Sequence, residues 1–332
     1  MKLGLNLGYA PPGTNPTDLV PLVQRAEQLG FDSVWAAESW GTDAVTVLSW
    51  MAACTSRIKV GSAIMQIPGR SPANTAMTAA TLDLMSGGRF LLGLGTSGPQ
   101  VVEGWHGDAW GKPLGKTREY VEIVRAALRR ELVEHDGEHY TIPYHGPGSS
   151  GLGKPLKLML RPLRADIPIY IAAIAPKNVA LTYEIADGWL PIFVVPERFA
   201  DAYGPPPADF EVAATVNVLV GDDVAALRDT LKPHVALYVG GMGAKGKNFY
   251  NALVQRYGWE AEAATIQDLY LAGHVREAIA AVPDELVDAV SLVGPKERIA
   301  ERLEVWKETP VTALLVGSPQ PEALEVLAEI VL

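Results

Sequence analysis

Eight short apolar runs recur along the 332-residue chain, and this recurrence constrains its fold more than any other feature. Most of the runs are apolar at successive positions, as expected for parallel strands that are covered on both faces. Segments with helical patterns separate them, with prolines at their starts and glycines such as Gly30 and Gly87 at their ends. The runs are residues 2–8, 33–38, 58–65, 90–95, 167–174, 188–195, 211–220 and 311–317.

Eight strands that alternate with helices predict an α/β fold, the (β/α)8 TIM barrel, which accommodates residues 1–332 as a single domain. The uneven spacing predicts insertions after strands 4, 5 and 7, at residues 96–116, 137–158 and 221–283. The second is predicted to form a hairpin and loop, and the third is predicted to be largely helical. The active site of this fold lies at the carboxyl ends of the strands, so the chemistry is expected there.

Charge and cysteine content exclude several classes of function. A net charge of −10 argues against general binding to nucleic acid or anionic lipid, since such binding needs a basic surface. The apolar stretches are too short to span a bilayer, and the first residues lack the pattern of an export signal. The single cysteine, Cys54, allows no internal disulfide. We therefore expect a cytoplasmic protein with a small-molecule substrate and without nucleic-acid or membrane partners.

A glycine pattern at the end of the fourth apolar run matches the GxGxxG motif of a dinucleotide-binding turn. The glycines are Gly93, Gly95 and Gly98. A true fingerprint needs a helix that opens at the third glycine and an acidic residue about twenty positions later at the end of a second strand. Here a proline and a long loop are expected after the third glycine, and Glu119 falls inside a predicted helix. Two interpretations remain: a turn that surrounds a phosphate or ring edge, or a turn that simply needs permissive glycines.

Other familiar chemistries have little support in the sequence. No HExxH motif or histidine and cysteine cluster predicts a metal site, and no GxSxG motif predicts a serine hydrolase. His106, between Glu103 and Asp108, is the single polar cluster that resembles metal ligands. Aromatic and apolar residues crowd the predicted mouth of the barrel, which favours a flat ligand. They are Tyr9, Trp40, Met65, Trp105, Trp110, Trp189 and Phe193.

Three stretches, residues 31–38, 61–98 and 168–191, together carry a resemblance to a known family. The middle stretch is the most specific, because a strand, a proline-started helix, an SGGR stop and a GxGT turn follow one another in fixed order. The chain resembles the luciferase-like monooxygenase superfamily, and within it the branch that uses the deazaflavin coenzyme F420. The resemblance extends over nearly the whole chain.

This resemblance implies a cofactor site for coenzyme F420, with FMN as the alternative. Members of the branch carry a non-proline cis peptide at the end of strand 3 against the deazaflavin ring, and the matching bond is Ala63–Ile64. The turn after strand 4 and the segment after strand 5 are implied to hold the cofactor's polar chain and phosphate. The implied cofactor-binding residues are Ala63, Ile64, Met65, Gly95, Thr96, Ser97, Gly98, Ala172, Ala173, Ala175, Pro176, Lys177 and Asn178.

The resemblance also implies hydride transfer between the deazaflavin and a substrate on its open face, within a homodimer. Glu38, beside Ser39, is the best-placed carboxylate for moving a proton, and His106 and Asp43 are further candidates. A structural salt bridge at the strand end is the alternative role for Glu38.

Departures from the family make two substrates doubtful. Sugar-phosphate dehydrogenases carry histidine and glutamate where this chain has Ser39 and Ser97, and methylene-tetrahydromethanopterin reductases carry glutamate in place of Asn6. An FMN-dependent monooxygenase and a flavin-binding protein without turnover are the alternative functions.

Overall fold

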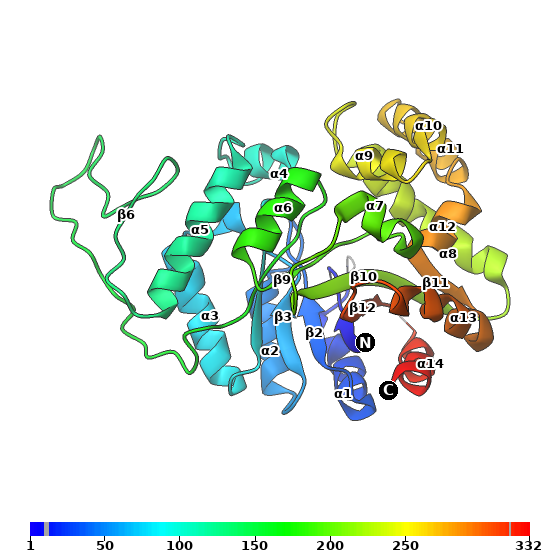
Figure 1. Cartoon of the computed structure of the whole chain (residues 1–332), viewed down its shortest axis with the longest axis horizontal. Helices are drawn as coiled ribbons and strands as arrows, with labels where there is room; N and C mark the ends of the chain where they lie inside the picture. Colours follow the sequence, from blue (N-terminus) through cyan, green and yellow to red (C-terminus); the bar gives the residue numbers. More distant parts are fainter. Residues whose placement is uncertain (10–12, 319) are drawn as a thin grey trace.

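The computed structural model describes residues 1–9, 13–318 and 320–332, and its central feature is a closed barrel of eight parallel strands surrounded by helices (Figure 1). β12 pairs with β1, with Leu3 opposite Leu314, and this pairing closes the barrel. The predicted (β/α)8 barrel is therefore confirmed. Its strands are β1 (Lys2–Asn6), β2 (Ser33–Ala36), β3 (Lys59–Ser62), β5 (Phe90–Gly95), β8 (Ile169–Ile171), β9 (Gly188–Trp189), β10 (Glu211–Val220) and β12 (Ala313–Gly317).

The helices around the barrel begin and end at the residues that the sequence marks. In α3, Ser71 caps the start by accepting a hydrogen bond from the Asn74 amide, and Pro72 occupies the first turn. Gly87 ends this helix in the left-handed conformation, with φ 70°. The helices are α1 (Val20–Leu29), α2 (Ala44–Ala53), α3 (Pro72–Ser86), α4 (Pro99–Gly104), α5 (Pro113–Leu128), α6 (Pro176–Ile185), α7 (Phe199–Tyr203), α13 (Lys296–Lys307) and α14 (Pro321–Val331).

Both faces of the strands are buried, but in two separate apolar clusters. One face packs against the helices, and the other fills the barrel interior around Trp35, Tyr170 and Leu315. Small residues make room for the large ones: a Cβ on Gly61 would lie 2.4 Å from the ring of Trp35. Two-sided burial explains why the runs are apolar at successive positions.

The second insertion lies before the fifth barrel strand, so its expected place after that strand is wrong. Its hairpin, β6 (His135–Asp136) and β7 (Thr141–Ile142), and the loop that follows connect α5 to β8. In this loop, Arg164 donates to the backbone carbonyl of Phe90, the first residue of β5. The loop therefore reaches the amino end of the barrel, away from the expected active site.

The third insertion is helical as predicted, but it ends in a strand that the sequence did not predict. β11 (Ser291–Gly294) pairs in parallel with β10 outside the barrel. The helices have an apolar cluster of their own, which Phe193 and Val195 from the barrel side join, and they gather at one end of the molecule (Figure 1). They are α8 (Val224–Ala236), the π-helix η4 (Leu237–Gly241), α9 (Phe249–Arg256), α10 (Glu260–Leu271), α11 (Val275–Ala280) and α12 (Asp284–Val290).

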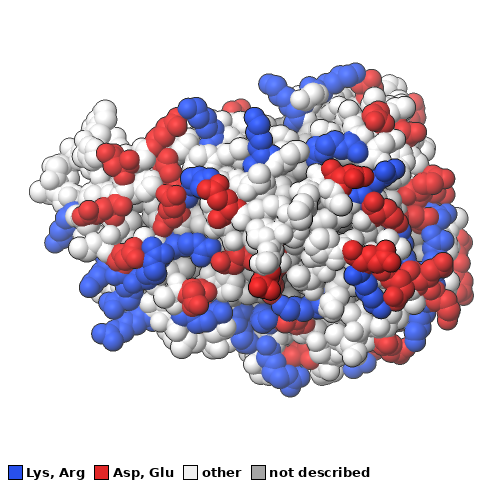
Figure 2. Space-filling model, viewed as in Figure 1, with Lys and Arg blue, Asp and Glu red and all other residues white. Residues whose placement is uncertain are grey.

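The two ends of the molecule differ in charge. Acidic side chains gather over the end formed by the insertion helices and α13, whereas the end that carries the loop before β8 is richer in basic ones (Figure 2). That loop supplies Lys154, Lys157, Arg161 and Arg164. Among the helices of the described ranges, none is long and apolar enough to cross a membrane.

Candidate active site

A bulge at the end of β3 forms the centre of the barrel mouth. The Ala63–Ile64 peptide bond is cis, as the resemblance implied, and the chain then forms the short strand β4 (Met65–Gln66), which pairs with the end of β5. Ala63 and Ile64 are partly exposed and pack, together with Ala172, on the apolar cluster of the barrel interior. Three of the expected cofactor residues thus lie together at the mouth.

The glycines of the GxGxxG pattern make room for this bulge. A Cβ on Gly93 would lie 1.7 Å from the carbonyl oxygen of Ser62, and one on Gly95 would lie 2.9 Å from the Ile64 side chain. The Ser62 hydroxyl donates to the Gly93 carbonyl at 2.8 Å. A side chain at Gly93 would push the backbone of the bulge away from β5, so this position requires glycine for close approach, whereas a side chain at Gly95 would displace the side chain of Ile64.

The turn after β5 differs in one detail from the expectation. The short helix α4 begins directly after Gly98, where a long loop was expected, and Ser97 has φ 57°. Glu119 is on α5, as predicted, and its carboxylate accepts hydrogen bonds from the backbone amides of the β6–β7 hairpin, including Tyr140 at 3.0 Å. Glu119 therefore supports the hairpin. It does not lie at the end of a second strand, where a dinucleotide-binding turn needs its acidic residue, so the dinucleotide interpretation fails.

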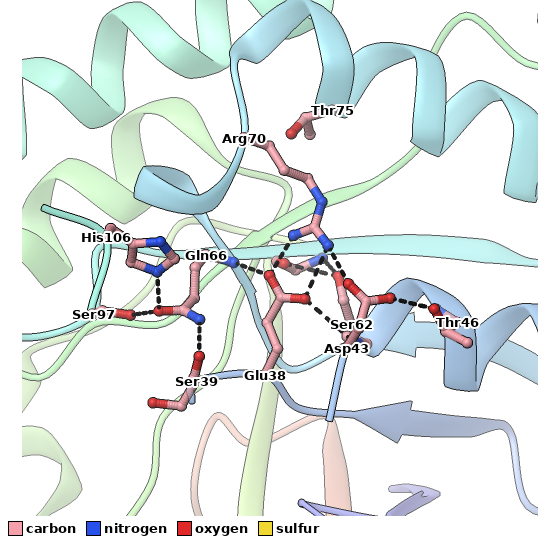
Figure 3. A network of polar contacts seen from close by, with 12 residues as sticks. Glu38, Ser39, Asp43, Thr46, Ser62, Gln66, Arg70, Thr75, Ser97 and His106 are labelled. Atoms are coloured by element: carbon pink, nitrogen blue, oxygen red, sulfur yellow. Dashed lines mark hydrogen bonds and ion pairs between the residues drawn. The ribbon is translucent and has the colours of Figure 1, made fainter. Parts of the chain in front are cut away.

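Glu38 lies at the mouth after β2, and its carboxylate is held on both oxygens (Figure 3). Arg70 donates to both oxygens, to Oε2 at 3.1 Å, in a bidentate pair. The backbone amides of Gln66 and Ala44 donate to Oε1 at 2.9 Å and Oε2 at 3.2 Å. Glu38 is only 7% exposed. This arrangement is the strand-end salt bridge that the sequence left as the alternative role for Glu38.

Asp43 completes the same ion-pair network. Its Oδ2 accepts from Arg70 Nη2 at 2.7 Å, and its Oδ1 caps α2 by accepting from the Thr46 amide at 2.7 Å. Burial alone would lower the pKa of Arg70, but the Glu38 and Asp43 carboxylates raise it above its ordinary value. The guanidinium therefore stays charged between its two partners and ties the β4 segment to the loop after β2.

A strip of neutral polar side chains lies beside this network, and Gln66 is its centre (Figure 3). The Gln66 amide nitrogen donates to the Ser39 carbonyl at 2.6 Å. Its oxygen accepts from the Ser97 hydroxyl at 2.7 Å and lies 3.2 Å from His106 Nε2. An amide oxygen only accepts, so this contact places a proton on Nε2 of His106. The strip joins the three expected site residues Ser39, Ser97 and His106.

The aromatic and apolar residues expected at the mouth divide into two groups. Tyr9 and Trp40 are 45% and 57% exposed at the carboxyl ends of β1 and β2. Met65 and Trp189 are fully buried in the core between strands and helices, and the Trp189 indole donates to the Ala173 carbonyl at 2.9 Å. Met65 therefore supports the bulge from beneath, which corrects the expectation that it lines the cofactor site. Ala173, 3% exposed, is likewise covered.

The segment after β8 carries groups that suit a phosphate. α6 begins at Pro176 with Ala175 as its N-cap, and Lys177 is exposed in its first turn. Pro176 has no N–H, and the amides of Asn178 and Val179 donate to the Ala175 carbonyl, so the Lys177 amide is the one that the first turn offers to an anion. The Asn178 side-chain oxygen is buried and has no hydrogen-bond partner among the described residues. An unpaired buried polar atom next to the start of α6 is a position where a ligand could supply the missing hydrogen bond.

Sequence reasoning missed several residues of the mouth. Gln66 and Arg70 follow the bulge closely, but their partners come from other loops, and no motif marks them. Three more come from the third insertion: His234, Tyr238 and Tyr250, whose rings contact Phe193. The spacing of His234 and Tyr238 on one helical face was the available signal. No group of three or more possible metal ligands occurs within residues 1–9, 13–318 and 320–332.

Comparisons with known proteins show the family to which the chain is similar. A family model described as luciferase-like monooxygenase matches residues 2–313. The chain is 45% identical to a putative coenzyme F420-dependent oxidoreductase of Mycobacterium tuberculosis, over 100% of this chain and 99% of that protein. It is 29% identical to a 5,10-methylenetetrahydromethanopterin reductase of Archaeoglobus fulgidus, over 96% and 94%. The solved coenzyme F420-dependent tetrahydromethanopterin reductase of Methanopyrus kandleri shares the fold, with a TM-score of 0.79 at 24% identity, over 99% and 98% of the two chains.

Proposed function

The chain belongs to the luciferase-like monooxygenase family, and from this premise we propose that it is a coenzyme F420-dependent oxidoreductase that transfers a hydride to or from a small organic substrate. The observation that carries the proposal is the full-length similarity to a protein named as an F420-dependent oxidoreductase. The mouth of the barrel supports it, because an apolar bulge at Ile64, the polar turn at Ser97 and the cation Lys177 all follow barrel strands at the carboxyl end.

Each part of the mouth has a place in this proposal. Ile64, on the bulge, would support the ring, and Ser97 and Gly98 would contact its edge or polar chain. The side chains of Lys177 and Asn178 and the Lys177 backbone amide would hold the phosphate. The cofactor, when bound, supplies a carbon that donates or accepts a hydride. The protein's own contribution is to position the reactants and to exclude water.

His106 is the residue that we propose moves the substrate's proton. Reduction of a carbonyl group adds a hydride to carbon and a proton to oxygen, and oxidation of an alcohol removes both. His106 is partly exposed, and because Nε2 donates to Gln66, Nδ1 is the nitrogen that would accept the proton on oxidation of an alcohol and return it on reduction of a carbonyl group. Both oxygens of Glu38, in contrast, are occupied by Arg70 and backbone amides. Glu38 is therefore proposed as a positioning residue, which keeps β4 and Gln66 in place.

The deciding experiment is a fluorescence titration of the purified protein with coenzyme F420 and, separately, with FMN. We expect micromolar or tighter binding of F420 and much weaker binding of FMN. The reverse preference, accompanied by oxygen uptake with reduced FMN, would replace this function with that of an FMN-dependent monooxygenase. Cofactor binding without turnover on a broad substrate panel would leave a flavin-binding protein.

We also propose that the protein is a cytoplasmic homodimer. Exposed apolar side chains gather on α3 and on the loop before β8, where Leu163 lies next to the end of α3, close to Gly88. Apolar surface of this extent is typical of an interface, and a second copy of the chain supplies a matching face by symmetry. The side chains are Met77, Leu84, Met85, Leu152, Leu156, Met159 and Leu163.

Sedimentation equilibrium tests the dimer. Met85→Glu is expected to convert dimers to monomers, because it buries a charge without a partner in the interface. Leu271→Glu is the matched control, since Leu271 is an exposed apolar residue on α10, within the third insertion. A wild-type protein that is monomeric at micromolar concentration would reject the dimer.

A further inference from the structure

Five aromatic rings from distant parts of the chain meet at one side of the barrel mouth. Phe193 stacks on His234 with 5.5 Å between ring centroids and contacts Tyr238 at 5.2 Å. Tyr250 lies 4.8 Å from Tyr238. Tyr9, at the end of β1, interacts through its side chain with Tyr238 and Ser39. We call Tyr9, Phe193, His234, Tyr238 and Tyr250 the aromatic wall.

Two members of the aromatic wall are accessible to solvent and at the same time enclosed by protein. His234 and Tyr9 are both exposed. Desolvation by surrounding protein nevertheless lowers the pKa of His234 and raises the pKa of Tyr9, although the Tyr238 and Ser39 side chains oppose the shift of Tyr9. Because Tyr9 and His234 are exposed, the aromatic wall presents accessible rings at the mouth of the barrel.

The aromatic wall borders the polar strip around Gln66 and His106. Tyr9 reaches Ser39, whose carbonyl binds Gln66, so the aromatic wall and the strip around His106 form one continuous surface. The cations at this end of the barrel have other partners: Arg70 pairs with Glu38 and Asp43, Lys245 pairs with Asp268, and Arg256 donates to the Ile174 carbonyl. Lys177 is in the first turn of α6. An anionic group of a ligand would therefore bind beside α6. The aromatic wall itself offers rings and neutral hydrogen-bonding groups.

From this geometry, and resting on the proposed function, we infer that the aromatic wall is the substrate site and that it selects an uncharged, ring-bearing carbonyl compound or its alcohol. The faces and edges of the rings pack against the ring of the substrate. His234 and Tyr9 supply hydrogen bonds to its oxygen, and the side chain of His234 is neutral at pH 7 because its pKa lies below the ordinary value. A carboxylate or phosphate on the substrate would lose its hydration here without gaining a counterion, so it is rejected.

Binding of benzaldehyde and benzoate to the F420-loaded protein tests this inference. The two probes share size and shape but differ in charge, and oxidised F420 leaves benzaldehyde with no hydride to accept, so the measurement is one of equilibrium binding. We expect isothermal titration calorimetry to show that the F420-loaded protein binds benzaldehyde with at least tenfold higher affinity than benzoate. Phe193→Ala and His234→Phe should each weaken benzaldehyde binding several-fold, while Tyr144→Ala, a tyrosine on the loop before β8, should leave it unchanged.

The outcomes separate the two proposals. Failure of F420 to bind would reject the proposed function, whatever the probes do. Normal F420 binding with equal affinities for benzaldehyde and benzoate, or with His234→Phe unchanged in benzaldehyde affinity, would reject the aromatic wall as the substrate site and leave the function standing. Phe193 is buried, so if Phe193→Ala does not fold, His234→Phe decides alone, because His234 is exposed and its ring is replaced by another ring.

Discussion

Ion pairs of similar composition lie at both ends of the barrel, but those at the amino end are closed units, whereas those at the carboxyl end are joined to accessible polar groups. At the amino end, Glu211 binds Lys2 through Oε1 at 2.5 Å and Tyr170 through Oε2 at 2.7 Å. At the carboxyl end, the pair of Glu38 and Arg70 also holds the Gln66 amide, and through Gln66 it connects to His106.

The difference shows how the fold separates stability from chemistry. Amino-end partners fix the starts of strands to one another, and their hydrogen bonds go to other groups of the fold. Asp83, fully buried, is another example: Arg164 binds it and the Phe90 carbonyl together. Residues at the carboxyl end come from the loops that follow the strands, where polar groups can remain available to bind a ligand. Mutations at the two ends should therefore have different signatures.

The largest effect on stability is expected from Arg164→Ala at the amino end. It leaves the buried Asp83 carboxylate without a counterion, which costs about 3 kcal/mol of unfolding free energy. Urea unfolding measures the loss, and F420 affinity should not change. Arg161→Ala, an exposed cation three positions earlier in the same loop, is the control and should unfold like the wild type. A large loss of F420 affinity in Arg164→Ala would contradict the separation of the two ends.

Glu38→Gln at the carboxyl end should have a smaller effect on stability and a specific effect on the mouth. Arg70 keeps Asp43 as a counterion, so we expect a loss of about 2 kcal/mol, below that of an unpaired buried charge. Turnover should slow with F420 affinity roughly intact, because Gln66 and His106 lose their fixed position.

The NMR resonances of His106 report this change directly. They should shift in Glu38→Gln, whereas those of His135, which binds Glu119 beside the β6–β7 hairpin, should stay in place. Unchanged His106 resonances together with unchanged turnover would remove Glu38 from the positioning network.

A third prediction concerns pH and the pair of Lys2 and Glu211. Burial raises the pKa of Glu211, but the bonds from Lys2 and Tyr170 outweigh it and leave the pKa below the ordinary value. Burial lowers the pKa of Lys2, but the hydrogen bond and the charge of Glu211 outweigh burial and leave the pKa above its ordinary value. The stabilisation is therefore complete above the unfolded pKa of Glu, roughly 4.3, and below that of Lys, roughly 10.4.

The pair's contribution is lost as the pH falls through the folded pKa of Glu211 or rises through that of Lys2. Both side chains are partly exposed, so the effect should stay below about 1 kcal/mol. Unfolding of Glu211→Gln and the wild type between pH 3 and pH 7 measures it, and the two curves should converge at the acid end. A constant difference across this range would contradict the linkage.

The smallest effect is expected from Lys112→Ala. Lys112 and Glu138 form an ion pair at 2.6 Å in which both side chains are largely exposed. Water and salt screen such a pair, so neither the unfolding midpoint nor F420 affinity should change measurably. A clear loss of stability would mean that the hairpin beside α5 depends on this contact.

Sequence alone was sufficient for the barrel and for part of its mouth. Apolar runs, proline starts and glycine stops predicted the barrel strands and the helices because these signals act within a few residues of one another. The position of the bulge at Ala63–Ile64 and the turn around Ser97 came from a motif order that belongs to a known family. The extra strand β11 was missed because its pairing with β10 depends on how the preceding helices return the chain.

What only the tertiary structure decided is which side chains meet. Nothing near Glu38 in the sequence shows that Arg70, 32 residues later, donates to both its oxygens, and this contact is the reason that we propose a positioning role for Glu38. Met65 is covered for a similar reason, since the bulge turns it inward. The aromatic wall joins β1, the end of β9 and the third insertion. Local propensities determine the helices and strands. Which side chains from different loops meet depends on the path of every segment between them, and that path exists only in the folded chain.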